Sequence, residues 1–309
     1  MNFQYHFKNI LVGVDFSEGS KAALREAARL ASLSDGSVHV VNVVEAEIFS
    51  YLHHVSGLRK PEIQLGRDRR MDVFLEEALK GIAGVSVSFQ CLVGPRFAEI
   101  ERKLEELDAD LLVLGRTGNR DQSFRHLGSL AAVMAREIPC HVMLVDPDQG
   151  EPYANVIAAI DDDEACNDVI WAAVTAARAS KAKLHFLHVY FPHWLECLKG
   201  HPEFYSLEAR ANSPSAEELA VKHAEEEKHR FREFLAAQRQ WLPEGNVEPV
   251  ILENPSVAGA MLSYTETVAQ SLVVFGRSCA PSNHDCIASS SLQAIQALNT
   301  SIFLTERPR

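Results

Sequence analysis

The chain has 309 residues, of which 47% are hydrophobic and 23% charged, so it is long enough to bury more than one core. Its net charge of −12 argues against a non-specific nucleic-acid binder, and no apolar run reaches the roughly 18 residues of a membrane span. The N-terminus lacks the pattern of a signal peptide and the cysteines form no CxxC pair, so we expect reduced thiols in a cytoplasmic protein.

Strands alternate with helices along the first half of the sequence. Ile10–Val14 is apolar almost throughout, as expected of a strand buried on both faces, and Ser17 can cap the helix that follows. Further strands are expected at Val38–Val44, Val85–Val93, Leu111–Leu114 and His141–Val145, with helices at Glu18–Ser32, Met71–Ile82, Phe97–Leu107 and Leu130–Arg136. This alternation predicts an α/β fold with a doubly wound, Rossmann-like parallel sheet. Ligands of such sheets bind beyond the carboxyl ends of the strands.

The second half repeats the first. Lys8–Asp15, KNILVGVD, resembles Ala154–Asp161, ANVIAAID, and the strand before Gly115 resembles the strand before Gly276. We therefore expect two tandem domains, residues 1–149 and 150–309, each with a five-stranded parallel sheet flanked by helices. In the second copy, helices are expected at Ser215–Leu242 and Ser256–Ala269 and strands at Leu184–Tyr190, Leu272–Phe275 and Ile302–Thr305.

A glycine-rich loop joins the fourth strand of the first copy to its last helix. Gly115, Gly118, Gly128 and Ser129 follow the strand with the spacing G-x2-G-x9-G-S, and Leu130 begins an apolar helical run. Glycines allow backbone to approach a phosphate, and a helix N-terminus with Ser at its cap offers N–H groups to an anion. No Lys adjoins Ser129, so this is not a Walker loop. The plainer interpretation is a long strand–helix loop with glycines for turns.

These glycines and Ser129 resemble the ATP-binding signature of the universal stress proteins. The resemblance implies an α/β domain that binds ATP or AMP and usually dimerises. It also implies that Asp15 lies beside the ribose or helps to hold Mg²⁺, and that the Val43 backbone contacts the adenine. As a plainer alternative, Asp15 is a turn or helix-capping residue. The nucleotide-binding residues implied by the resemblance are Gly13, Val14, Asp15, Val43, Gly115, Arg116, Gly118, Gly128, Ser129 and Leu130.

Gly115 and Gly118 would pass close to the ribose and α-phosphate, and Gly128 and Ser129 would hold the outer phosphates. Arg116, Arg120 and Arg125 lie in the same loop, and any one of them could pair with phosphate. The plainer expectation is that two of these three arginines are exposed to solvent.

The second copy departs from this pattern. It keeps Asp161 and Gly276, but Cys279 replaces the next glycine and Ser289-Ser290 replaces Gly-Ser. Side chains then stand where backbone should approach phosphate, so we expect the second copy to bind ATP poorly or not at all. Its serines could still hold another anion, and a lipid or other amphiphile under the insert after residue 190 is a further alternative.

Two histidines and one cysteine in that insert have a spacing that could suit a zinc ion. His193, Cys197 and His201 are four residues apart and would share a helix face, but Pro202 weakens the helical case. Incidental His and Cys residues are the favoured interpretation, as are inert thiols at Cys279 and Cys286. No residue is assigned to catalysis or to a metal.

The sequence therefore favours a nucleotide-dependent regulatory protein that is at most a weak ATPase, because no general base is evident near the γ-phosphate. An ATP-consuming ligase or pyrophosphatase would need a different loop after the first strand, and a flavin or dinucleotide carrier would need glycines there. We expect the two copies to pack together within the chain, with His141–Val145 near Ile302–Thr305. The whole chain could also form a homodimer.

Overall fold

The computed structural model describes residues 7–118, 127–148, 152–160, 167–191, 216–239, 242, 247–277 and 289–306. The strands are β1 (Asn9–Gly13), β2 (Ser37–Val44), β3 (Ser86–Val93), β4 (Leu111–Gly115), β5 (His141–Val145), β6 (Asn155–Ala159), β7 (Lys183–Tyr190), β8 (Val247–Glu253), β9 (Ser271–Phe275) and β10 (Ser301–Leu304). The helices are α1 (Glu18–Ser34), α2 (Ala46–Ser56), α3 (Lys60–Ala78), α4 (Arg96–Leu107), α5 (Ser129–Glu137), α6 (Asn167–Ser180), α8 (Ala216–Ala237), α9 (Val257–Thr267) and α10 (Ser289–Ala297).

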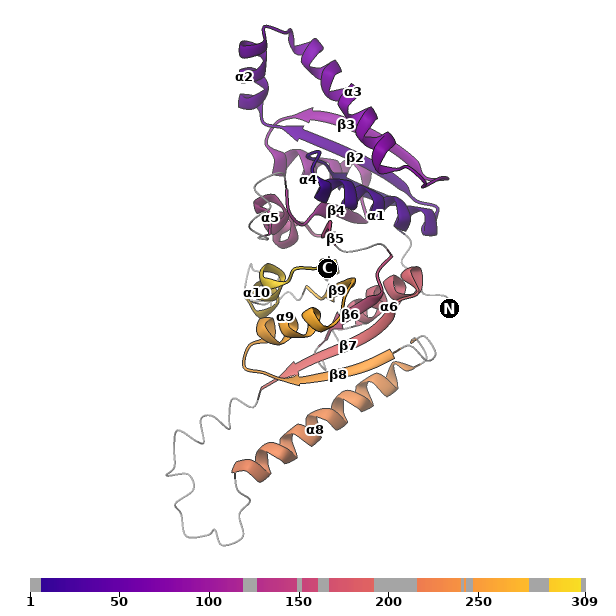
Figure 1. Ribbon diagram of the computed structural model, residues 1–309, viewed down its shortest axis with the longest axis vertical. Coiled ribbons are helices and arrows are strands. Elements are labelled where there is room, and N and C mark those ends of the chain that lie inside the picture. Colours follow the sequence, from indigo (N-terminus) through magenta and orange to yellow (C-terminus); the bar gives the residue numbers. More distant parts are fainter. Residues whose placement is uncertain are drawn as a thin grey trace.

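All of these strands belong to one ten-stranded sheet, in the order β3-β2-β1-β4-β5-β10-β9-β6-β7-β8 (Figure 1). Each half of the chain contributes five parallel strands in the same relative order, as expected for doubly wound α/β units. The halves join through antiparallel pairing of β5 with β10, which sets Leu144 opposite Ile302 and Val142 opposite Leu304. The expected approach of His141–Val145 to Ile302–Thr305 is confirmed.

Helices cover both faces of the sheet. On one face, buried side chains of α1, α3, α6 and α8 pack on the strands, and on the other face those of α4, α5, α9 and α10 do so. Strand β4 is covered on both sides, since Leu111, Leu112 and Val113 are completely buried. Its near-continuous apolar run is what a strand between two helical layers requires.

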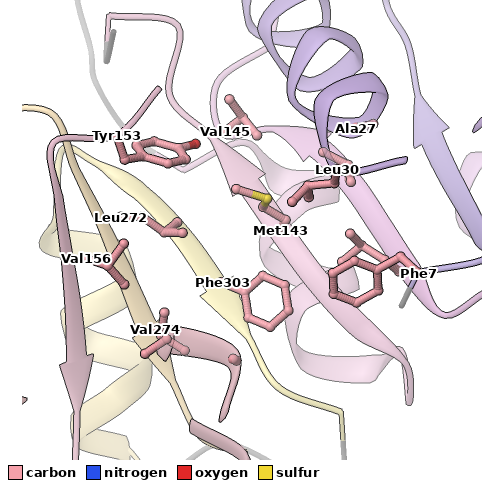
Figure 2. Close-up of a cluster of buried hydrophobic side chains, with 14 of the residues drawn as sticks. Phe7, Ala27, Leu30, Met143, Val145, Tyr153, Val156, Leu272, Val274 and Phe303 are labelled. Carbon is pink, nitrogen blue, oxygen red and sulfur yellow. The ribbon is translucent and has the colours of Figure 1, made fainter. Parts of the chain in front are cut away.

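The junction between the halves has its own apolar packing (Figure 2). The rings of Phe7, His141 and Phe303 of β10 contact one another, with centroid separations of 5.8 Å, 6.1 Å and 5.5 Å for the pairs Phe7–His141, Phe7–Phe303 and His141–Phe303. Met143, Leu272 and Tyr153 extend the same cluster, and all are almost fully buried. Burial of each large apolar side chain contributes roughly 1.5–3 kcal/mol, so this cluster ties the halves together.

Two helices differ from the sequence-based expectation. Helix α2 was not predicted, and the helix expected at Met71–Ile82 instead runs from Lys60 to Ala78. Only four side chains of α3 are buried, so its polar first half carries little apolar periodicity. The predicted end at Ile82 is wrong because Gly81 takes a left-handed backbone, with φ of +86°, which interrupts a helix. Within the described ranges, no helix has the length and apolar composition to cross a bilayer.

Candidate functional site

A cleft of about 2110 Å³ opens beyond the carboxyl ends of β1, β2 and β4, next to the first turn of α5. Parallel pairing of β1 with both β2 and β4 brings these strand ends together. The ten residues proposed from the sequence all line this cleft: Gly13, Val14, Asp15, Val43, Gly115, Arg116, Gly118, Gly128, Ser129 and Leu130.

Asp15 lies in the cleft and is exposed. Its Oδ1 accepts hydrogen bonds from the backbone N–H of Ser17 at 3.1 Å and from the Ser17 hydroxyl at 2.5 Å. Ser17 in turn accepts from the N–H of Ser20 and caps α1, as predicted. Asp15 is therefore a turn residue as well as a cleft residue, and its Oδ2 points toward the glycine loop. The two interpretations of this carboxylate are compatible.

The three loop glycines serve different purposes. A β-carbon on Gly115 would lie 2.6 Å from the carbonyl carbon of Gly19, so this position must lack a side chain for α1 to pack against β4. A β-carbon on Gly118 would lie 3.0 Å from Asp15 Oδ2. On Gly128 the nearest protein atom would be 3.5 Å away, which is ordinary contact. The protein itself thus leaves room beside Gly128, where a ligand could approach the backbone.

Helix α5 begins beside that room. Its N-cap is Gly128 rather than Ser129, and no side chain caps the helix. This corrects the expectation of a capping serine: Ser129 is the first helical residue, because the Gly128 carbonyl already accepts from the N–H of Ala132. The first N–H groups of a helix have no partner within the helix, and they carry the positive end of its dipole. The start of α5 is therefore suited to hold an anion.

Arg116 contributes its backbone to the cleft but turns its side chain away. Its N–H donates to the carbonyl of Val145 at 2.8 Å, and its carbonyl accepts from the N–H of Gly128 at 2.9 Å. The side chain is completely buried, and Nη2 donates to the carbonyl of Leu298 in the second half. Pairing of this guanidinium with phosphate, one of the sequence-based options, does not fit that position. Arg120 and Arg125, the other two, lie outside the described residues.

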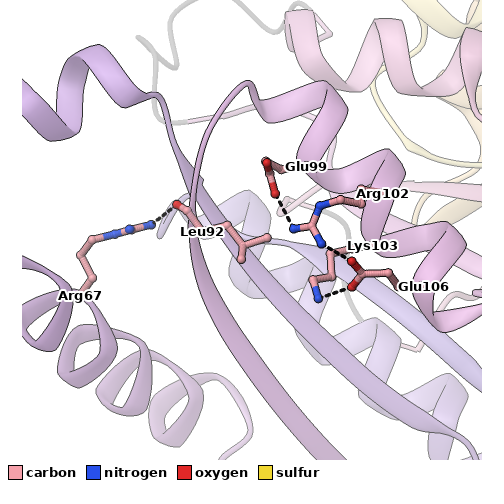
Figure 3. A network of polar contacts seen from close by, with 6 residues as sticks. All are labelled: Arg67, Leu92, Glu99, Arg102, Lys103 and Glu106. Carbon is pink, nitrogen blue, oxygen red and sulfur yellow. Dashed lines mark hydrogen bonds and ion pairs between the residues drawn. The ribbon is translucent and has the colours of Figure 1, made fainter. Parts of the chain in front are cut away.

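Sequence reasoning missed a further cation, Arg67, which also lines the cleft. Arg67 of α3 donates from Nη2 to Asn42 Oδ1 at 2.9 Å. The same nitrogen donates to the carbonyl of Leu92 at 2.9 Å (Figure 3). Asn42 is buried and donates to the carbonyl of Val14 at 2.8 Å, which connects Arg67 to the residue before Asp15. Burial lowers the pKa of Arg67. No local motif marks this arginine, since α3 itself was only partly predicted.

Other basic side chains line the cleft as well. These are Lys21, Arg25, Arg70 and Arg96, and the acidic residues in the lining are Asp15, Glu18, Asp146 and Asp148. The cleft is thus richer in positive charge than the chain as a whole, whose net charge is −12. By contrast, the ion pairs of Arg102 with Glu99 and Glu106 on α4 (Figure 3) are exposed and contribute little to stability.

Most of the candidate residues of the second half lie outside the part of the chain that the structure describes. Asp161, His193, Cys197, His201, Cys279 and Cys286 lie outside the described residues, as do the side chains of Ser289 and Ser290. Gly276 does follow β9, and Arg277 after it is buried against the first half.

Comparisons with known proteins agree with this architecture. The model of the universal stress protein family matches residues 6–146. A Staphylococcus haemolyticus protein assigned to the universal stress proteins is 30% identical over 147 residues, which cover 45% of this chain and 84% of that protein. A universal stress protein structure from Archaeoglobus fulgidus has a TM-score of 0.63 at 16% identity, covering 98% of this chain and all, 100%, of the other. A Pseudomonas aeruginosa structure assigned to the same class has a TM-score of 0.65 at 14% identity, covering 98% of this chain and 94% of the other. These two likenesses show the fold over nearly the whole chain.

Proposed function

Because this chain belongs to the universal stress protein family, we propose that its first half binds an adenine nucleotide, ATP or AMP, and acts as a nucleotide-dependent regulator. One observation carries the proposal: Asp15, Gly118 and the uncapped start of α5 meet in a single cleft. A carboxylate for a ribose and N–H donors for phosphate are the polar groups that a nucleotide needs.

Each part of the nucleotide would contact a different part of this cleft. The N–H groups of Ser129 and Leu130, with the Ser129 hydroxyl, would hold the phosphates at the helix start. Asp15 would accept from a ribose hydroxyl or help to hold Mg²⁺, since a carboxylate is a ligand that this cation prefers. The Val43 backbone at the end of β2 would contact the adenine, as the family resemblance implies.

We further propose that the chain consists of two tandem domains, residues 1–149 and 150–309, and that only the first holds ATP. The family match over residues 6–146 and the repeated strand order support this division. The β5–β10 pairing would then be the contact between the two domains. Fast hydrolysis is not part of this proposal: binding and release of the nucleotide would provide the signal, with slow ATP hydrolysis at most.

Native mass spectrometry of the purified protein tests nucleotide binding. We expect an adenine nucleotide to co-purify with the wild-type chain, or to be retained after incubation with ATP and Mg²⁺. Asp15→Asn should weaken retention, whereas Asp72→Asn on α3, an exposed carboxylate outside the residues that line the cleft, serves as the matched control. A flavin in place of an adenine nucleotide, or equal retention by both variants and the wild type, would contradict the proposal.

A further inference from the structure

Arg277 comes from the second half, yet most of its hydrogen bonds reach the first half. Its side chain is 2% exposed, and Nε donates to the carbonyl of Thr305 at 2.5 Å, which anchors it beside β10. Nη1 donates to the carbonyls of Ala135, at 3.4 Å, and Ile138, and Nη2 donates to those of Pro139, at 3.5 Å, and Cys140. One guanidinium therefore holds the chain segment 135–140.

That segment contains the last residues of α5 and the three residues that follow the helix. The helix stops at Glu137, and the carbonyls of its last turn have no further N–H partners within the helix. Of the carbonyls that Arg277 contacts, that of Ala135 belongs to this last turn and that of Ile138 to the C-cap, so the buried cation lies at the negative end of the helix dipole. Arg136, the basic residue on α5 itself, bonds to Glu137 in solvent instead. Arg277 is consequently the buried charge that fixes this end of α5 in the described structure.

The opposite end of α5 is the start that faces the cleft, with Gly128, Ser129 and Leu130. A nine-residue helix is rigid, so a clamp at one end determines where the N–H groups of the other end point. We infer that Arg277 is a positioning residue for the phosphate-binding end of α5, so that the second half completes the anion site of the first. This inference rests on the proposed nucleotide binding. It gives Arg277, which follows Gly276 in the second copy, a role in the binding site of the first copy.

The reverse contact supports the inference. Arg116, which follows Gly115 as Arg277 follows Gly276, donates to the carbonyl of Leu298 directly after α10. Its carbonyl also accepts the N–H of Gly128. The glycine loop of the first half is thus connected to the second half at both Arg116 and α5.

The experiment compares full-length Arg277→Met and Arg277→Lys with Phe303→Leu, which loosens the junction without touching α5. Isothermal titration with ATP and with adenosine separates phosphate contacts from base contacts. Arg277→Met removes the charge at the end of α5, so we expect its ATP affinity to fall roughly tenfold more than its adenosine affinity. Arg277→Lys keeps the charge and should show a smaller difference. Phe303→Leu should leave the ratio of the two affinities unchanged. Equal losses for ATP and adenosine in Arg277→Met would overturn the inference.

Hydrogen exchange provides a second readout that needs no nucleotide. In the ligand-free protein, amides of residues 129–137 should exchange faster in Arg277→Met than in Phe303→Leu at matched global stability. Unchanged exchange in α5 would overturn the positioning role by itself. If the wild type bound no nucleotide, the proposed function would fail, and the exchange data would still show whether Arg277 holds α5.

Discussion

A β-carbon on Gly118 would stand 3.0 Å from Oδ2 of Asp15. The glycine loop after β4 and the carboxylate after β1 are therefore direct neighbours, although 103 positions separate them in sequence, from 15 to 118. The spacing of 3.0 Å is tighter than an ordinary contact, so the neighbour of any side chain at position 118 must shift. Any side chain at position 118 would therefore push the Asp15 carboxylate out of its present position, and a larger one would push it further.

Gly118→Val should reduce nucleotide affinity with little effect on folding. The added branched side chain would displace the Asp15 carboxylate, which is exposed and can move without opening the core. We expect ATP affinity to fall by roughly tenfold or more, the size of one lost polar contact to a ligand. Isothermal titration measures the affinity, and a melting curve close to that of the wild type shows that the fold is retained. Wild-type affinity in this variant would argue against a nucleotide between Asp15 and Gly118.

Gly115→Ala should destabilise the protein. Its β-carbon would lie 2.6 Å and 2.9 Å from the backbone of Gly19 and Ser20, and these atoms cannot rotate away as a flexible side chain could. Overpacking of this kind lowers the free energy of unfolding by roughly 1–3 kcal/mol. Urea denaturation measures the change. Gly66→Ala in α3 is the control: its β-carbon meets no atom within 4 Å, so it should raise stability by roughly 0.5–1 kcal/mol. Equal effects of the two variants would contradict the contact between β4 and α1.

His141 should make stability depend on pH in the acid range. Burial, with a contribution from the charge of Arg277, lowers the pKa of His141 from 6.5 to about 4, and its Nδ1 accepts from the N–H of Glu306 at 2.8 Å. The unfolded chain takes up the proton more readily than the folded chain. The stabilisation from neutral, buried His141 is therefore complete above pH 6.5 and is lost as the pH falls toward 4. The loss amounts to about 3 kcal/mol.

The measurement for His141 is the free energy of unfolding at several pH values between 7 and 4. His141→Asn, whose Oδ1 can replace the Nδ1 acceptor, should lose less stability than the wild type over this interval. Parallel curves for the two proteins would show that His141 titrates alike in the folded and unfolded chains.

Arg67→Met should weaken both the fold and the cleft. The substitution removes the donors to Asn42 Oδ1 and the Leu92 carbonyl, and it leaves the buried Asn42 amide partly unsatisfied. A buried polar group without its partner costs about 1–3 kcal/mol. Because Asn42 also holds the Val14 carbonyl next to Asp15, ATP affinity should fall as well. Arg69→Met is the matched control on the same helix, since Arg69 is exposed and is not among the residues that line the cleft. A larger loss of stability in Arg69→Met would refute this account of Arg67.

The strands were predictable from local apolar patterns, whereas the residues of the cleft were indicated by the resemblance to a known family. A short apolar run that ends at a glycine, such as Leu111–Leu114, is typical of a buried strand, and parallel pairing then brings Asp15 and Gly115 to one edge of the sheet. Alternation of strands and helices likewise determined the fold class.

Long-range packing determines what the sequence could not show. Whether Arg116 faces a phosphate or a carbonyl of Leu298 depends on the second half of the chain, which no pattern in the loop encodes. No sequence pattern marks the contact of Arg277 with the first half, for the same reason. The loop pattern suggests that Gly115 lies near the ribose and α-phosphate, whereas its nearest neighbour in the structure is the start of α1. Helix α2 and the start of α3 were missed because exposed helices with few buried side chains lack a clear apolar period.

The stoichiometry of ATP binding in solution tests the central claim most directly. Isothermal titration of the full-length chain with ATP and Mg²⁺ should give one site per chain. Replacement of Gly128 by Val, which fills the space beside the start of α5, should abolish that site, whereas Ser289→Ala in the second copy should leave it intact. Two sites per chain, no site in the wild type, or equal loss in the Gly128 and Ser289 variants would contradict a nucleotide held by the first half alone.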